Sequence, residues 1–69
     1  MDRTPVESRT ILDIGYDSAS MTLEIGFKSG GVYQYFDVPE TMYQELMNAP
    51  SKGSFLHQNI KGNYRYVKL

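Results

Sequence analysis

The residues best suited to chemistry gather in the last third of the chain, where cations and aromatic rings occur without an acid. The last of the eight acids is Glu45; up to it the chain has three cations, and beyond it four cations and no acid. Lysine and arginine attract phosphates, and tyrosine rings stack on bases. This segregation predicts a nucleic-acid-binding surface with these candidate residues: Lys52, His57, Lys61, Tyr64, Arg65, Tyr66 and Lys68.

A simpler interpretation of the same segment is an ordinary solvated basic face, because many basic surface runs bind nothing specific. Tyr64 and Tyr66 flank Arg65, so they combine stacking surface with phosphate attraction, yet packing explains them equally well. If the second half of the chain folds so that residues 51–61 lie beside the tail, the cations and His57 form one patch.

A second aromatic pair, Tyr33 and Tyr35, lies in an alternating segment in the middle of the chain. Exposed aromatic side chains on a sheet can stack on unpaired bases. In so small a chain the same rings can instead fill the core and extend their hydroxyls to its rim. The sequence leaves both interpretations open.

Catalysis and metal binding have little support. His57 is the single histidine and there is no cysteine, whereas a catalytic serine needs an adjacent base held by a third group, and a zinc site needs several nitrogen or sulfur ligands. The segment at 51–54 lacks the glycine framework and the preceding strand of a phosphate-binding loop. We therefore expect a non-enzymatic protein with no cofactor and no metal.

The 69 residues suffice for one small domain, so residues 1–69 are predicted to fold as a unit. No apolar run reaches the roughly 18 residues of a membrane span, and the first residues lack the layout of a signal peptide. We expect a soluble, cytoplasmic protein. Residues 1–8 are polar and contain Pro5, which predicts an irregular, frayed lead-in.

The elements that must position these residues begin with three predicted strands, at 10–16, 21–28 and 32–37. The first shows partial alternation of apolar residues, and the second shows strict alternation, which places alternate side chains on one inward face. The partial alternation of the first strand consists of Leu12, Ile14 and Tyr16. The inward residues expected in the second strand are Met21, Leu23, Ile25 and Phe27.

The loop between the second and third strands decides which way the tyrosines point, because a one-residue change in register moves every side chain to the other face. A two-residue loop pairs Phe27 with Val32 and turns Tyr33 and Tyr35 away from the core. A three-residue loop pairs Phe27 with Tyr33 and places both tyrosines over the core. We favour the second, since it uses both glycines at 30–31 and supplies aromatic volume.

Two helices are predicted after the strands. Pro39 suits the first position of a helix, and Pro50 ends it; its apolar stripe contains Met42, Tyr43, Leu46, Met47 and Ala49. Ser51 caps a second helix that extends to about residue 61 and ends at Gly62. The tail at 63–69 alternates again, as a fourth strand or an extended arm.

The fold class expected is therefore α+β: a three-stranded antiparallel meander followed by two helices packed on one face, with a possible fourth C-terminal strand.

Several short motifs occur in order along the chain: Ile-Gly-Tyr-Asp at 14–17, Tyr-Gln-Tyr at 33–35, Val38, Pro39, Tyr43, Leu46, Ala49, Ser51, Gly53, Phe55 and Ile60. As an ordered set they resemble the KTSC domain, a module named for its place at the C-terminus of some lysyl-tRNA synthetases and also found as a free-standing bacterial protein. The resemblance extends from Ser8 to Tyr66.

The resemblance implies a module without an established activity, for which RNA binding is suspected because of its attachment to a tRNA enzyme. The central Tyr-x-Tyr of the family matches Tyr33 and Tyr35. The chain departs from the family pattern at His57, where Asn is common, so no role is carried to that residue.

The leading hypothesis is a small RNA-binding module that contacts phosphates through its basic last third. The alternative is a protein-interaction module that binds a partner, or a second copy of itself, through a sheet edge or a helix surface.

Overall fold

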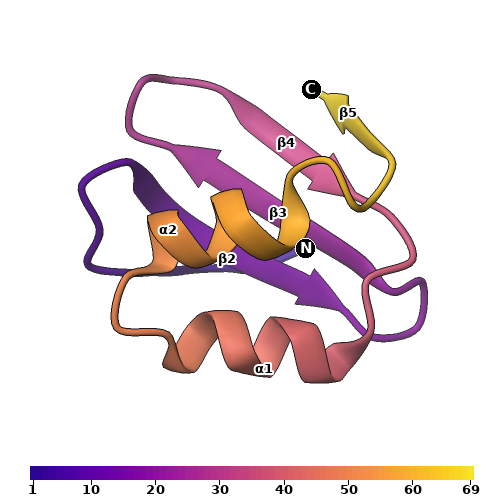
Figure 1. The fold of residues 1–69 in the computed structure, drawn as a ribbon. Helices are drawn as coiled ribbons and strands as arrows, with labels where there is room; N and C mark the ends of the chain where they lie inside the picture. Colours follow the sequence, from indigo (N-terminus) through magenta and orange to yellow (C-terminus); the bar gives the residue numbers. More distant parts are fainter.

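The computed structural model describes all 69 residues and contains one five-stranded antiparallel sheet with its helices on one face (Figure 1). The sheet order is β1-β2-β3-β4-β5, so each strand lies beside its neighbour in sequence. The elements are β1 Arg3–Pro5, β2 Ile11–Asp17, β3 Thr22–Phe27, β4 Val32–Tyr35, α1 Glu40–Asn48, α2 Lys52–Phe55, the π-helical turn η1 Leu56–Ile60, and β5 Tyr66–Lys68.

The sheet has two strands more than the predicted three-stranded meander. The tail forms the optional strand, β5, which pairs with β4 through Tyr35 and Tyr66. The lead-in expected to be frayed forms β1, with Arg3 opposite Gly15 in β2. Pro5 is tolerated there because β1 is an edge strand.

The core lies between the sheet and the two helices. Leu23 and Ile25 are fully buried, as the alternation predicts, and Phe27 is half-buried. Met21 is 40% exposed, so its inward placement was wrong; its φ of 54° places it in the turn before β3. The buried core consists of Ile11, Ile14, Leu23, Ile25, Tyr35, Val38, Leu46, Leu56 and Ile60.

A β-bulge in β2 corrects the prediction for the first strand. The register shifts between Ile11 and Asp13, so Ile11 and Ile14 both face the core. Leu12, which alternates with Ile14 and Tyr16 in the sequence, is half exposed. Simple alternation fails here because the bulge adds one residue to β2.

The β3–β4 loop is a three-residue loop, although it lies one residue earlier than expected. The amide of Phe27 donates to the carbonyl of Gly31, and Gly30 has a φ of 110° that favours glycine. Tyr33 therefore lies opposite Ile25, and Tyr35 opposite Leu23. The exact pairs differ from the prediction, but both tyrosines are on the core side, because a two-residue shift preserves the face.

The helices lie close to their predicted bounds. Pro39 is extended (φ −63°, ψ 150°) and precedes the first helical residue, Glu40, instead of occupying that position. Ser51 caps α2, its Oγ accepting a hydrogen bond from the amide of Ser54 at 3.3 Å. α2 continues into η1, and Gly62 follows with a φ of 83°.

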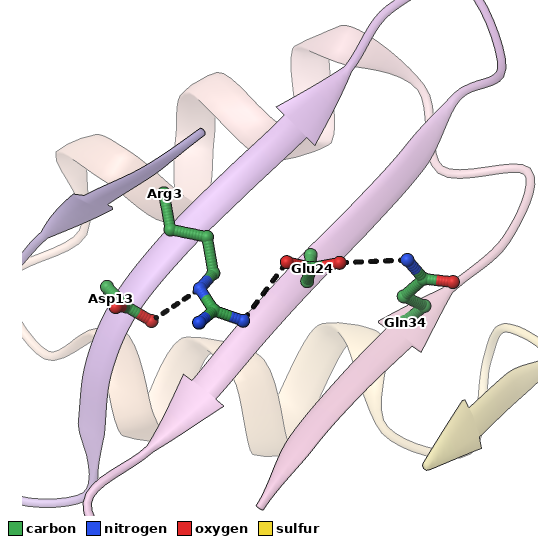
Figure 2. Close-up of polar contacts among 4 residues, drawn as sticks. All are labelled: Arg3, Asp13, Glu24 and Gln34. Carbon is green, nitrogen blue, oxygen red and sulfur yellow. Dashed lines mark hydrogen bonds and ion pairs between the residues drawn. The ribbon is translucent and has the colours of Figure 1, made fainter. Parts of the chain in front are cut away.

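A polar network crosses the sheet on the face opposite the helices, and it holds β1 in place (Figure 2). The Arg3 guanidinium contacts Asp13 Oδ1 at 3.1 Å and Glu24 Oε2 at 3.0 Å. Glu24 Oε1 also accepts a hydrogen bond of 2.8 Å from the side-chain amide of Gln34. Because Glu24 is only 8% exposed, its charge needs the cation that β1 supplies.

No helix of the structure has the length and apolar character required to cross a membrane.

Candidate nucleic-acid interface

The largest concavity of the molecule is a groove of about 830 Å³. It lies between the start of α2, the start of β2 and the end of β3. The amide of Lys28 donates to the carbonyl of Thr10 at 2.9 Å, which joins those strand ends. The start of α2 lies close to the segment before β2: a Cβ added to Gly53 would lie 2.9 Å from Thr10 Oγ1. We call this the basic groove, after its four cationic lining residues Arg9, Lys28, Lys52 and Lys61; His57 also lines it.

The positive charge in the basic groove is not neutralised. Of the seven lysines and arginines in the chain, only Arg3 and Arg65 form ion pairs. The basic groove contains four of the remaining five and a single carboxylate, Glu7. Cations that line one concavity without acidic partners attract an anionic ligand, even in a chain whose net charge is −1.

Short hydroxyl side chains also line the basic groove. Ser8 Oγ accepts hydrogen bonds from the amides of Thr10 and Ile11, and Ser51 Oγ accepts from Ser54. Because a hydroxyl has one proton to donate as well, both serines can still donate to an oxygen in the groove. The groove thus offers cations and hydroxyl donors, the two kinds of group that bind phosphate.

A second, aromatic concavity of about 540 Å³ lies beside the first, between β4, β5 and the end of η1. We call it the aromatic hollow; its lining residues include Phe27, Tyr33, Tyr35 and Tyr66. The Phe27 and Tyr33 rings meet edge to face, with centroids 5.4 Å apart. Tyr66 is tilted by 37° against both Tyr33 and Tyr35, at 5.8 and 5.7 Å.

The two concavities share Phe27, Ser29 and Lys61. The ammonium of Lys61 lies 5.6 Å from the centre of the Phe27 ring. A cation over an aromatic face at this distance is attracted to the ring. Charge and aromatic surface are therefore continuous from the basic groove into the aromatic hollow.

Tyr35 lies at the base of the aromatic hollow and is only 2% exposed. Burial raises the pKa of its phenol above the ordinary value of 10.0, and the neighbouring Tyr33 and Tyr66 raise it further. Tyr35 therefore presents a neutral hydroxyl, which can donate a hydrogen bond.

The predicted site residues divide between these two concavities and other places. Lys52, His57 and Lys61 line the basic groove, and Tyr66 lines the aromatic hollow. Lys68 lies beside the hollow, with its ammonium 6.0 Å from the centre of the Tyr33 ring.

Tyr64 and Arg65 lie apart from both concavities. Tyr64 is half-buried and packs against the core. Arg65 lies directly before β5 and pairs with Asp37 at 3.2 Å. The cations of the last third therefore do not all belong to one patch.

Two groove residues, Arg9 and Lys28, were missed because they lie in the acidic part of the sequence. The predicted antiparallel pairing could have identified Arg9 and Lys28, since it brings the start of one strand beside the end of the next. The observed register places Ile11 opposite Phe27, so Arg9 and Lys28 lie at the same end of the sheet.

The two tyrosines of the central Tyr-x-Tyr occupy different environments. Tyr35 belongs to the core, whereas Tyr33 is half-buried and contributes an accessible wall of the aromatic hollow. No group of three or more His, Cys, Asp or Glu side chains is arranged to hold a metal.

Comparisons with known proteins give a consistent result. The family model of the KTSC domain matches residues 7–64. A solved KTSC domain protein from Yersinia pestis is 47% identical, with a TM-score of 0.96 over 99% of this chain and 96% of that one. A protein of Tsukamurella paurometabola is 38% identical over 94% of this chain and 97% of its own length.

A lysine–tRNA ligase of Trichormus variabilis is 48% identical over 63 residues, which are 91% of this chain. The match spans 11% of the ligase, so the similarity concerns one small module of that enzyme.

Proposed function

Because this chain belongs to the KTSC domain family, we propose that it is a non-enzymatic module that binds RNA by its phosphates. The observation that carries the proposal is the basic groove, where four cations without acidic partners converge from three separate segments. Phosphate contacts supply most of the affinity of a sequence-independent nucleic-acid binder. Arg9, Lys28, Lys52 and Lys61 are the phosphate-binding residues.

The family relationship favours RNA over other polyanions. A relative that contains this module is named a lysine–tRNA ligase, and its named substrate is tRNA. A module that held the phosphates of an RNA would assist such an enzyme without taking part in its chemistry. The proposal of such an RNA partner also implies a cytoplasmic location for the module.

The test is a salt titration with short single-stranded RNA, measured by fluorescence anisotropy. About four phosphate contacts predict a log-log slope of about −3. Lys28→Gln and Lys52→Gln should each weaken binding and reduce the magnitude of the slope by about 0.7. Arg65→Gln removes the same charge outside the groove and is the matched control, with affinity and slope expected to stay near those of the parent protein.

Two results would refute RNA binding. One is the absence of amide shifts in an NMR titration at low salt and millimolar RNA. The other is a set of shifts centred on α1, which carries Glu40 and Glu45 and lies outside the basic groove.

The alternative function, a protein-interaction module, is favoured by a different surface. β5 is an edge strand; Val67, within it, is 44% exposed, and Leu69, just after it, is 67% exposed. An unpaired strand edge beside apolar side chains suits strand addition by a partner. Binding there should change little with salt, so the same titration distinguishes the two functions.

A further inference from the structure

The aromatic hollow gives the proposed RNA site a selectivity that phosphate contacts alone do not supply. Four of its seven lining residues are aromatic, and Tyr66, the most accessible of the four, is 58% exposed. Such rings pack against flat apolar surfaces, and every nucleic-acid base has two of these.

The rings around the hollow leave one another's faces partly free. Tyr66 is inclined by 37° to both Tyr33 and Tyr35, so it stacks on neither. By contrast, Tyr16 and Tyr43 elsewhere in the molecule form a closed stack, with centroids 4.8 Å apart and planes 8° from parallel. Tyr66 therefore retains a face for a ligand.

The phenol hydroxyls at the hollow are also unused. Tyr16 is the one tyrosine whose hydroxyl makes a hydrogen bond within the protein, to the carbonyl of Val38. The hydroxyls of Tyr33, Tyr35 and Tyr66 have no such partner, and none of them is sealed from solvent. Three neutral donors and acceptors around an aromatic cavity suit the polar edge of a base.

We propose that the aromatic hollow accepts one unpaired base, stacked on Tyr66, while Lys61 and the basic groove hold the adjoining phosphates. This inference rests on the proposed RNA binding and adds a substrate class, namely RNA with an unpaired nucleotide. The shared residues Phe27, Ser29 and Lys61 make the geometry possible, because a base in the hollow leaves its phosphate at the mouth of the groove.

Duplex RNA does not satisfy this site. A paired base has both faces covered by its neighbours in the helix, and moving it into a cavity requires unstacking and unpairing. A single strand or a bulged nucleotide avoids most of that cost. The module should therefore discriminate among RNAs by the presence of an unpaired base.

Three RNAs that share one strand test the inference: the single strand, its blunt duplex, and the duplex with one bulged uridine. We expect the single strand and the bulged duplex to bind at least about fivefold tighter than the blunt duplex. This difference matches the binding free energy that one stacked base contributes. Tyr66→Ala should remove that preference and leave the salt slope unchanged, because no phosphate contact is lost. Tyr66→Phe keeps the ring and should retain the preference.

A second measurement needs no variant. Uridine monophosphate should shift the ring protons of Tyr33 and Tyr66, whereas ribose 5-phosphate should shift only residues of the basic groove. Equal binding of all three RNAs, with the effect of Lys28→Gln intact, would overturn the unpaired-base inference and leave phosphate binding standing. Failure of every RNA to bind would overturn both.

Discussion

The ammonium of Lys61 lies 5.6 Å from the centre of the Phe27 ring, at the boundary between the basic groove and the aromatic hollow. Lys61 follows η1 and Phe27 ends β3, so this contact joins the helical layer to the sheet. It also places one cation between the proposed base site and the proposed phosphate site. This position makes Lys61 the most informative residue to change.

Lys61→Gln should weaken binding of single-stranded RNA about fivefold at low salt, which corresponds to about 1 kcal/mol for one exposed charge contact. The salt slope should fall in magnitude by about 0.7. Lys61→Arg keeps the charge and should restore most of the affinity. An unchanged slope in Lys61→Gln, measured beside Arg65→Gln, would remove Lys61 from the phosphate contacts.

Arg3→Ala should destabilise the protein by about 1–3 kcal/mol, because Glu24 keeps its buried charge and loses its cation. Urea unfolding at neutral pH measures the difference. Asp2→Ala alters an exposed neighbour that makes no ion pair, and its cost should stay within about 0.5 kcal/mol. Similar costs for the two variants would mean that β1 is not held by its ion pairs.

Gly26→Ala should also destabilise the protein, since a Cβ at this position would clash with Asp13 Oδ1. Asp13 must then turn away from Arg3 and lose the 3.1 Å contact. In the Asp13→Ala background, Gly26→Ala should lower the free energy of unfolding by a smaller amount. A double-mutant cycle should then give a coupling energy of about 0.5–3 kcal/mol. Additive costs would contradict the steric explanation.

The raised pKa of Tyr35 predicts a loss of stability in alkali. Above pH 10 the unfolded chain releases the phenol proton while the folded chain still holds it, so unfolding becomes more favourable. This contribution to stability is complete below pH 10 and is lost as the pH rises through the folded-state pKa. Tyr35→Phe has no such proton, so its free energy of unfolding should fall less steeply above pH 10 than that of the parent protein. Parallel curves for the two proteins would contradict the prediction.

Local patterns in the sequence were sufficient to predict much of the architecture. The alternation of Leu23 and Ile25, the prolines at 39 and 50, and the Ser51 cap predict strands and helices because each acts over a few residues. The same locality explains the errors. Nothing near Arg3 indicates a strand, since its partners Asp13 and Glu24 lie 10 and 21 residues away, and nothing in β2 indicates the bulge that exposes Leu12.

The candidate site depended more on the tertiary structure. The sequence by itself determined which residue types were available: an acid-free basic segment, two Tyr-x-Tyr pairs and a single histidine. The fold decided which of them meet. Antiparallel pairing brings Arg9 and Lys28 to the groove and brings Tyr66, in β5, to the hollow, whereas Arg65, just before β5, pairs with Asp37. Residues that are distant in the sequence meet only when the strands pair in the right register. That register is set by pairing between segments, so no local sequence pattern contains it.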